Sequence, residues 1–279
     1  MPDAALPDAA ATARLVDLAA DLARQAGDLV REGRPDRVDV AATKSSPVDV
    51  VTERDLASEA LLRSLLARER PDDGILGEEG EPVTGTSGLT WVLDPIDGTV
   101  NYLYGIPAYA VSVAVVAGPA VPERWTAVAG AVHGVADGRT YTAGRGLGAA
   151  CDGRPLRVNA ARPPAESLVA TGFAYTAQRR GEQAQLLAEL MPHIRDVRRI
   201  GSAALDLCAV AAGNLDLYYE RGLKPWDLAA GALVATEAGA RVCGLRGEPA
   251  GEPMTVAGPP ESVEWLVAFL EERRATSGA

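Results

Sequence analysis

The arrangement of apolar segments in the second half of the chain is the feature that most constrains the fold. Short apolar runs, typical of strands, alternate there with longer segments whose apolar residues recur every three or four positions, typical of helices. The alternating segments, strand first, are 167–173, 181–194, 197–201, 202–213, 215–220, 225–239 and 241–244, and a last helix is expected over 261–274. Such alternation predicts an α/β architecture for this half.

The first half shows a different pattern and predicts helices packed on an antiparallel or mixed sheet. Helices are expected over about 10–31 and over 53–70, the second capped by Thr52 and stopped by Pro71. Their apolar stripes are expected at Leu15, Leu18, Ala19, Leu22, Ala26 and Leu29, and at Leu56, Ala60, Leu61 and Leu65. A short strand opens "GILGEEG" at 74–80, long strands are expected within 108–118 and 125–134, and glycine turns over 139–158 predict hairpins.

The length of 279 residues suits one large domain or two closely packed parts, and 47% apolar residues are enough for a substantial core. A soft boundary is expected near 159–164, which is rich in proline and small residues. We therefore expect an N-terminal α+β part, residues 1–160, that carries the acidic motifs described below. A C-terminal α/β part, residues 161–279, would complete the same site.

Charge and cysteine usage exclude several classes of protein. A formal net charge of -11 opposes binding to nucleic acid or anionic lipid, because both need a cationic surface. No apolar run reaches membrane-spanning length, and the acidic, helix-like N-terminus is unlike a signal peptide. Three widely spaced cysteines form no disulfide or zinc pattern, and two histidines, His133 and His193, are too sparse for a zinc site. We expect a cytoplasmic protein that binds neither nucleic acid nor membrane.

The stretch "WVLDPIDGTVNY", residues 91–102, carries the most chemical information. Asp94 ends an apolar strand, Pro95 fixes the next φ angle, and Asp97, Gly98 and Thr99 can open a helix with free backbone N–H groups. Such a corner offers carboxylates to a cation and amides to a phosphate. Magnesium takes hard oxygen ligands and completes its shell with water and phosphate oxygens, so the stretch predicts a metal and phosphate anchor.

Two other uses of this acidic stretch are disfavoured by spacing. An EF-hand loop needs a glutamate at its twelfth position, which counting from Asp94 is Gly105. A phosphatase that forms an aspartyl phosphate commonly has its two acids two residues apart, whereas Asp94 and Asp97 are three apart. A purely structural interpretation, with Asp97 as a helix cap and Asp94 as a turn former, stays open from this motif alone.

Further acids lie where strands or loops end, and each is weak evidence when taken alone. Glu78 and Glu79 follow a short strand, Asp49 precedes the second helix, and Asp227 begins a later helix. Adjacent carboxylates repel unless a cation lies between them or one faces solvent. Small residues at 229–231 would let the helix that starts at Asp227 pack very closely against its neighbours. Together these positions predict carboxylates that converge from separate elements.

Three separated signatures make this chain similar to the magnesium-dependent, lithium-sensitive inositol monophosphatases. They are "GEE" at 77–79, "DPIDGTVNY" at 94–102, and "WDLAAG" at 226–231 followed by "EAG" at 237–239. The resemblance covers roughly 44–244 and also includes the segments before the first and third signatures. It implies a layered αβαβα sandwich of the inositol monophosphatase and fructose-1,6-bisphosphatase type, and commonly a homodimer.

The resemblance also implies a metal site with two or three Mg²⁺ ions. Glu78, Asp94 and the Ile96 carbonyl would hold the first ion, and Asp94, Asp97 and Asp227 the second. Glu78 would also reach a weaker third ion, with two residues in supporting roles: Glu79 beside it and Lys44 as a nearby electrostatic group.

Catalysis and substrate binding are implied for residues around those ions. Thr99 and Asp49 would orient and deprotonate the attacking water, so that with Glu78 they form the catalytic set. The amides of Gly98 and Thr99 would bind phosphate. Inositol hydroxyls would be bound by Ala203, Glu220 and Asp227.

The implied reaction is magnesium-dependent hydrolysis of inositol monophosphate, a small phosphorylated polyol, to inositol and phosphate. Histidinol phosphate, fructose 1,6-bisphosphate and 3'-phosphoadenosine 5'-phosphate are the alternatives with the same chemistry. Glu220 favours a polyol, because a second phosphate would prefer a cation, although Arg221 and Lys224 lie close by in sequence. A phosphatase scaffold that binds the transcription apparatus is the alternative from a different class.

Overall fold

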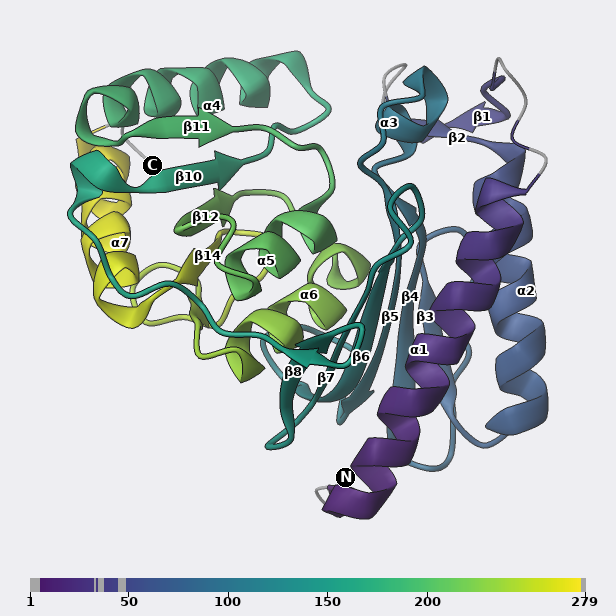
Figure 1. The fold of residues 1–279 in the computed structure, drawn as a ribbon. Coiled ribbons are helices and arrows are strands. Elements are labelled where there is room, and N and C mark those ends of the chain that lie inside the picture. The colour runs from purple at the N-terminus through teal and green to yellow at the C-terminus, as the bar shows by residue number, and fades with distance from the viewer. Residues whose placement is uncertain (1–5, 33, 35–37, 45–48, 277–279) are drawn as a thin grey trace.

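The computed structural model describes residues 6–32, 34, 38–44 and 49–276, which form five layers of alternating helices and sheets (Figure 1). The expected αβαβα sandwich is confirmed, and the first half is indeed helices on a mixed sheet. The segment 45–48, part of the resemblance near Lys44, lies outside the described residues. Among the described residues, no helix combines the length and apolar character needed to cross a membrane.

The first two layers are a pair of helices and a seven-stranded sheet. The helices are α1 (Ala9–Arg31) and α2 (Glu53–Glu69). The strands, in their order along the chain and across the sheet, are β3 (Gly74–Gly77), β4 (Leu89–Asp97), β5 (Ala110–Ala117), β6 (Thr126–Gly134), β7 (Thr140–Gly144), β8 (Gly148–Cys151) and β9 (Arg154–Pro155). Only β3 and β4 run parallel, and every other neighbouring pair is antiparallel.

The middle of the seven-stranded sheet is buried on both faces, which explains its nearly continuous apolar runs. Trp91 and Leu93 point to the core under α1 and α2, whereas Val92 between them belongs to the core on the opposite face. All eight residues of β5 are buried. Two-sided burial fixes the register of β4, and therefore the position of the acids at its carboxyl end.

The central layer consists of α5 (Ala203–Ala211) and α6 (Pro225–Glu237), which lie between the two sheets (Figure 1). Close packing through small residues is confirmed there. A Cβ added at Gly231 would lie 2.9 Å from Leu207 Cβ of α5, and one added at Gly130 of β6 would lie 3.1 Å from the Cα of Ala230. The helices therefore approach the sheet closely enough for the first turn of α6 to reach the end of β4.

The last two layers are a five-stranded sheet and two outer helices. Its strand order is β11 (Asp196–Arg198), β10 (Leu168–Thr171), β12 (Leu217–Glu220), β14 (Thr255–Gly258) and β13 (Arg241–Cys243), covered by α4 (Ala177–Leu190) and α7 (Pro260–Thr276). The alternating pattern predicted every element except β14, which pairs antiparallel with both β12 and β13. Smaller elements are β1 (Ala42–Thr43), β2 (Val50–Val51), α3 (Thr99–Tyr104), η1 (Pro164–Glu166) and η2 (Met191–His193).

The Thr52 cap of α2 is confirmed by a reciprocal capping box with Asp55. Its predicted apolar stripe is confirmed at buried Leu65 and half-buried Leu61 and is wrong at Leu56 and Ala60. Leu56 is 49% exposed and Ala60 is also exposed. The buried face instead consists of Asp55, Ser58, Glu59, Leu62, Leu65 and Leu66. The first half of this buried face is polar because it faces the acidic site described next.

Candidate active site

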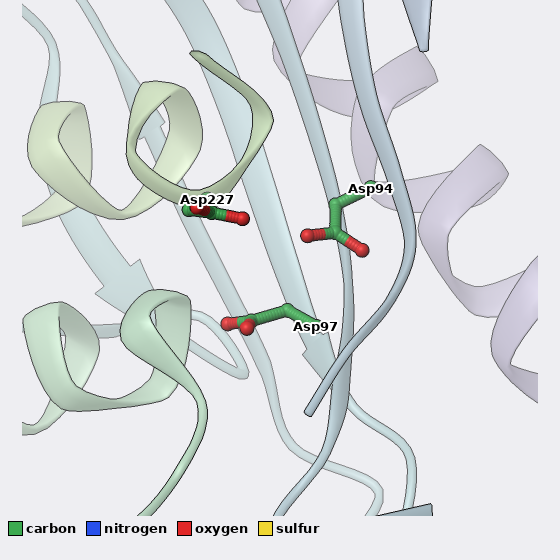
Figure 2. A group of neighbouring side chains, drawn as sticks. All are labelled: Asp94, Asp97 and Asp227. Atoms are coloured by element: carbon green, nitrogen blue, oxygen red, sulfur yellow. The ribbon is translucent and has the colours of Figure 1, made fainter. Parts of the chain in front are cut away.

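The carboxyl end of β4 brings Asp94 and Asp97 to the same side of the sheet. Residues three apart on a regular strand point to opposite faces. Here the pairing with β5 shifts between Asp94 and Asp97, an irregularity at Pro95 and Ile96 that turns the second carboxylate toward the first. A carboxylate oxygen of Asp94, of Asp97 and of Asp227 all lie within 4.8 Å of one another (Figure 2).

Each of these three carboxylates is held by a donor from the protein. Asp94 Oδ1 accepts the N–H of Ile96 at 3.0 Å, and Asp227 Oδ2 accepts the N–H of Lys224 at 2.6 Å in the first turn of α6. Asp97 Oδ2 accepts bonds from Ser202 Oγ at 2.7 Å and from the N–H of Ala204 at 2.6 Å. The start of α5 therefore fixes Asp97, and the acids are preorganised by three separate elements.

Burial and mutual repulsion make this cluster costly to ionise without a counter-charge. Burial, then the neighbouring carboxylates of Glu78, Asp97 and Asp227, raises the pKa of Asp94 well above its usual range. Burial likewise raises the pKa of Asp97 to about 6, despite the hydrogen bonds that favour its charged form. Converging hard oxygen donors with excess negative charge suit a divalent cation such as Mg²⁺, so the residues present fit the implied metal.

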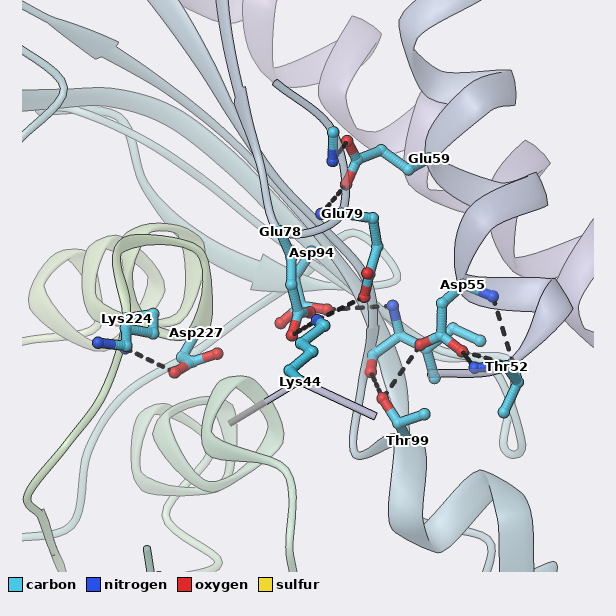
Figure 3. Close-up of polar contacts among 12 residues, drawn as sticks. Lys44, Thr52, Asp55, Glu59, Glu78, Glu79, Asp94, Thr99, Lys224 and Asp227 are labelled. Carbon is cyan, nitrogen blue, oxygen red and sulfur yellow. Dashed lines mark hydrogen bonds and ion pairs between the residues drawn. The ribbon is translucent and has the colours of Figure 1, made fainter. Parts of the chain in front are cut away.

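The loop after β3 brings Glu78 and Glu79 to the edge of this cluster (Figure 3). Lys44 Nζ lies 2.7 Å from Glu78 Oε1 and 2.6 Å from Glu79 Oε1. Burial raises the pKa of Glu78 to about 7, although Lys44 opposes the shift. Burial disfavours the charge of Lys44, but the two carboxylates outweigh it and raise the pKa of its ammonium group. The predicted Lys44, Glu78 and Glu79 are therefore brought together.

Glu59 of α2 fixes the shape of that loop. Its carboxylate accepts the N–H groups of Glu79 and Gly80, both at 2.8 Å (Figure 3). It also accepts the Nε–H of Arg63 at 2.7 Å. A Cβ at Gly77 would collide with the Glu59 carboxylate. The Glu59 carboxylate therefore explains why glycines, Gly77 and Gly80, flank the two glutamates. The sequence analysis did not identify Glu59.

Thr99 contacts an acid that the sequence analysis did not select. Its Oγ1 lies 3.0 Å from the Ile96 carbonyl oxygen and 3.1 Å from Asp55 Oδ1 (Figure 3). Asp55 Oδ2 also accepts the N–H of Thr52 at 2.8 Å, and burial raises the pKa of Asp55. Asp55 therefore closes the capping box of α2 and also joins α2 to Thr99 at the start of α3. Asp49 directly precedes β2, and its assigned role stays a prediction.

A cavity of about 330 Å³ opens beside the acids. Of the residues expected to bind substrate, it is lined by Gly98, Ala203, Glu220 and Asp227. Glu220 Oε2 accepts the Tyr218 hydroxyl at 2.7 Å, and burial raises the pKa of Glu220 to about 7. A Cβ at Gly172 would collide with this carboxylate, so glycine is required there. The lining also includes basic residues absent from the prediction.

Gly98 adopts φ +98, a left-handed conformation that favours glycine, and it precedes α3 directly. A Cβ at this position would also lie 2.9 Å from the Ala108 carbonyl oxygen. Asn101 holds the same region by donating to the carbonyls of Ala108 at 2.7 Å and Ile200 at 2.8 Å. The turn is therefore rigid and gives the cavity an accessible stretch of backbone at its metal end.

The histidines and cysteines lie away from this chemistry. His133 is buried on β6 with Nδ1 3.0 Å from Thr140 Oγ1, and His193 packs edge-on against Phe269. Cys208 and Cys243 are buried and all three cysteines are free. Both residue types are used for packing, as expected.

Comparison with known proteins agrees with this geometry. The profile described as "Inositol monophosphatase family" matches residues 12–273. The inositol-1-monophosphatase SuhB of Mycobacterium tuberculosis is 48% identical over 278 residues, covering 93% of this chain and 94% of the relative. The Nus factor SuhB of Pasteurella multocida is 37% identical over 235 residues, covering 84% and 86%.

A solved structure extends the similarity to three dimensions. The structure of Mycobacterium tuberculosis SuhB superposes with a TM-score of 0.78 at 46% identity, covering 94% of this chain and 97% of the other. Sequence and fold therefore agree over nearly the whole chain. The chain belongs to the inositol monophosphatase family and is a phosphoric monoester hydrolase.

Proposed function

We propose that this enzyme hydrolyses inositol monophosphate to inositol and phosphate in a reaction that depends on Mg²⁺. The observation that carries the proposal is the convergence of Asp94, Asp97 and Asp227 within 4.8 Å beside a cavity that also exposes Glu220. Carboxylates that would bind cations then lie next to a carboxylate that would accept hydrogen bonds from hydroxyl groups. Such a pair of subsites matches a polyol that carries one phosphate.

Two or three ions would be held by residues in the positions described above. Glu78, Asp94 and the Ile96 carbonyl would hold one ion, and Asp94, Asp97 and Asp227 another, so that Asp94 bridges the two. Glu78 would reach a third ion, with Glu79 and Lys44 in support. When bound, such ions neutralise phosphoryl oxygens, lower the pKa of a bound water and stabilise the leaving alkoxide.

The chain's own groups would position and deprotonate the attacking water. We assign this role to Thr99 and Asp55, because the Thr99 hydroxyl lies 3.1 Å from the Asp55 carboxylate, and this assignment replaces the Asp49 of the sequence prediction. Asp55 would accept the proton while Thr99 holds the oxygen in place. A general base alone contributes about 10² to 10⁴ in rate, so most of the acceleration has to come from the cation site.

Binding of the phosphate and of the polyol would use opposite sides of the cavity. The N–H groups of Gly98 and Thr99 at the start of α3 would donate to phosphate oxygens. Glu220, held by Tyr218, would accept bonds from ring hydroxyls, and Ala203 and Asp227 would complete that side. This orientation would put the ester oxygen beside the acidic cluster.

A role as a binding partner of the transcription apparatus is the competing proposal, motivated by the Nus factor name of the relative from Pasteurella multocida. Such a role does not require three carboxylates to be held close together against their repulsion. The acidic cluster therefore favours catalysis. We further propose a homodimer with lithium-sensitive activity in the cytoplasm, where the three free cysteines would stay reduced.

Phosphate release tests the proposal directly. We expect inositol 1-phosphate to be hydrolysed only with Mg²⁺, less so with Li⁺ present, and faster than histidinol phosphate or 3'-phosphoadenosine 5'-phosphate. Asp94→Asn should abolish turnover while the chain stays folded, since the change removes a bridging ligand and a buried charge. Turnover that persists in Asp94→Asn, or that is independent of Mg²⁺ in the wild type, would contradict the assignment.

A further inference from the structure

A second cavity, of about 670 Å³, lies on the opposite face of the five-stranded sheet from the substrate cavity. It is lined mainly by α4, α7 and the strand ends between them. Side chains alternate across a strand, so Glu220 of β12 lines the substrate cavity while the preceding Tyr219 lines this one. The volume is within the range of small-molecule sites, and the proposed phosphatase reaction uses none of it. The second cavity therefore has room for a ligand other than the substrate.

The second cavity combines an apolar lining with two buried hydroxyl groups. Four apolar side chains line it: Leu186, Leu245, Met254 and Leu270. Thr171 and Tyr219 lie among them, and both are buried. Burial raises the pKa of Tyr219, and the neighbouring Thr171 hydroxyl opposes that shift. An apolar ligand body would therefore contact the leucines and the methionine, and the hydroxyl groups would give it a fixed orientation.

The residues that line the second cavity carry a surplus of positive charge, although the whole chain has a formal net charge of -11. The charged residues of the lining are Arg221, Arg246, Arg273, Glu182 and Glu189. Glu189 is already paired with Arg273 at 3.4 Å. Three guanidinium groups against two carboxylates leave one positive charge, which complements a ligand with one negative charge.

Arg246 is the best candidate to bind that negative charge. It is exposed, whereas Arg221 and Arg273 are half-buried. Its backbone has φ +55, a left-handed conformation that residues other than glycine seldom adopt, and Glu271 of α7 accepts its N–H at 2.5 Å. Within the described part of the chain, the guanidinium group of Arg246 forms neither an ion pair nor a hydrogen bond. Its donors are therefore available to an anionic ligand.

Gln183 of α4 connects the second cavity to the wall of the substrate cavity. It lines the second cavity, and its Oε1 accepts the N–H of Ala174 at 2.8 Å. Its Nε2 lies 3.5 Å from the carbonyl oxygen of Gly172 and 3.4 Å from that of Arg221. Gly172 lies directly against the Glu220 carboxylate, and Arg221 lines both cavities. A ligand that contacts Gln183 or Arg221 therefore acts on the backbone that holds Glu220.

We propose that the second cavity binds a small molecule with an apolar body and a single negatively charged group, such as a carboxylate, and that this ligand weakens substrate binding. The apolar body would lie against Leu186 and Met254, and the anionic group would accept hydrogen bonds from Arg246. Contact with Gln183 would loosen the wall that holds Glu220. The binding site does not depend on which ester the enzyme hydrolyses, and only the effect on substrate rests on the proposed function.

Two fluorescent probes with the same apolar body test the site in the full chain with Mg²⁺. 8-Anilinonaphthalene-1-sulfonate carries one negative charge, and N-phenyl-1-naphthylamine is its neutral counterpart. We expect the sulfonate probe to bind at least about tenfold more tightly than the neutral probe, the size of a charge-assisted hydrogen bond. At saturation the sulfonate probe should raise KM for inositol 1-phosphate and leave kcat unchanged, because only ground-state binding is affected.

Two substitutions in the cavity separate this site from the substrate cavity. Arg246→Gln should reduce the affinity for the sulfonate probe to nearly that for the neutral probe. Leu186→Glu should weaken both probes, because it puts a carboxylate into the apolar lining. Both variants should also lose the effect of the sulfonate probe on KM, and thermal unfolding confirms that each is folded.

Arg241→Gln is the matched control. It removes the same charge from the neighbouring strand β13, but Arg241 is paired with Glu264 at 3.5 Å and does not line the cavity. The proposal is overturned if the sulfonate probe binds no more tightly than the neutral one, if both cavity variants keep its affinity, if Arg241→Gln reduces that affinity equally, or if KM does not respond to the probe. Probe binding without any Mg²⁺-dependent hydrolysis of inositol 1-phosphate would instead refute the proposed function alone.

Discussion

Two helices cover the same face of the seven-stranded sheet, and they bury opposite kinds of residue. In α1 the buried positions are Thr12 together with alanines, leucines, a glycine and a valine, with no charged side chain among them. In α2 the first buried positions are Asp55, Ser58 and Glu59, and apolar residues follow only from Leu62 onward. Figure 1 shows the two helices side by side, with α1 over β5, β6 and β7 and α2 over β4.

The difference shows that the two halves of α2 have different roles. The second half packs against the apolar core, and the first half contacts the candidate active site. Asp55 contacts Thr99, and Ser58 Oγ donates to the Pro95 carbonyl at 3.2 Å. Glu59 holds the loop that carries Glu78 and Glu79. Three polar side chains on successive turns therefore position three parts of the site, whereas α1 supplies packing alone.

Replacing Asp55 by asparagine should have the largest effect and would show whether the polar half of α2 acts in catalysis. We expect turnover at saturating Mg²⁺ to fall about 10² to 10⁴-fold, because asparagine cannot accept the proton from the attacking water. The free energy of unfolding should fall by about 1 to 3 kcal/mol, since asparagine has one acceptor oxygen fewer and leaves either the Thr52 N–H or the Thr99 hydroxyl without its partner. Steady-state kinetics and thermal unfolding measure the two effects.

Asp49→Asn serves as the control for this assignment. Asp49 directly precedes β2, and it was the water-activating acid predicted from the sequence. A larger loss of turnover in Asp49→Asn than in Asp55→Asn would restore the original assignment and leave α2 with a structural role alone.

Substitutions in the apolar half of α2 should lower stability and leave turnover nearly unchanged. Leu62 is fully buried, so Leu62→Ala should lower the free energy of unfolding by about 2 to 5 kcal/mol and leave turnover of the folded enzyme nearly unchanged. Leu56→Ala should change stability by less than about 0.5 kcal/mol, because Leu56 is 49% exposed. Chemical denaturation measures the free energy of unfolding of both variants. Similar losses of stability would mean that Leu56 contributes to the core, as the predicted stripe requires.

The same two helices show how far sequence reasoning extends. Periodicity located both helices, and in α1 it identified buried Leu15, Ala19, Leu22 and Ala26. In the first half of α2 it failed at Leu56 and Ala60, because a hydrophobic pattern cannot distinguish a buried acid from an exposed one. Only the capping motif marked Asp55, and its contact with Thr99 depends on tertiary structure.

The acidic site itself was easier to predict than its surroundings. Asp94 and Asp97 are close in sequence at a strand end, and the resemblance supplied Asp227 and Glu78. The strand irregularity that turns the two aspartates together, the anchor Glu59 and the cavity arginines all depend on elements distant in the chain. Strand β14 was missed because a short apolar segment after Pro253 carries no periodic signal.

The acids near α2 should also make stability depend on pH and on Mg²⁺. The folded state holds Asp97 with a pKa of about 6 and Glu78 with a pKa of about 7, both above their usual values. The folded state therefore binds more protons than the unfolded state between about pH 4 and 7. Without divalent cations, we expect stability to fall as pH rises, by about 1.4 kcal/mol per pH unit for each extra proton.

Unfolding midpoints measured across this pH range in the presence of a chelator give the pH dependence of stability. Saturating Mg²⁺ should remove most of that dependence, because bound cations replace the protons. Asp94→Asn should show a shallower dependence in chelator, since it removes one member of the repelling cluster. A stability that rises between pH 5 and 7 in chelator, with the same slope in Asp94→Asn, would contradict the predicted repulsion.

Glu59→Gln should have little effect on kcat at saturating Mg²⁺ and tests whether the buried anchor serves the metal site. Glutamine keeps one acceptor, so only one of the two N–H groups of Glu79 and Gly80 stays paired. The loop should loosen at Glu78, and the Mg²⁺ concentration for half-maximal activity should rise about 10 to 100-fold, as for partners that orient metal ligands. Calorimetric titration of Mg²⁺ gives the same affinity without turnover. Glu59 neither lines the cavity nor belongs to the three clustered aspartates, so kcat at saturating Mg²⁺ should stay near that of the wild type. A loss of kcat with unchanged Mg²⁺ affinity would contradict this and give Glu59 a role in catalysis, like that of Asp55.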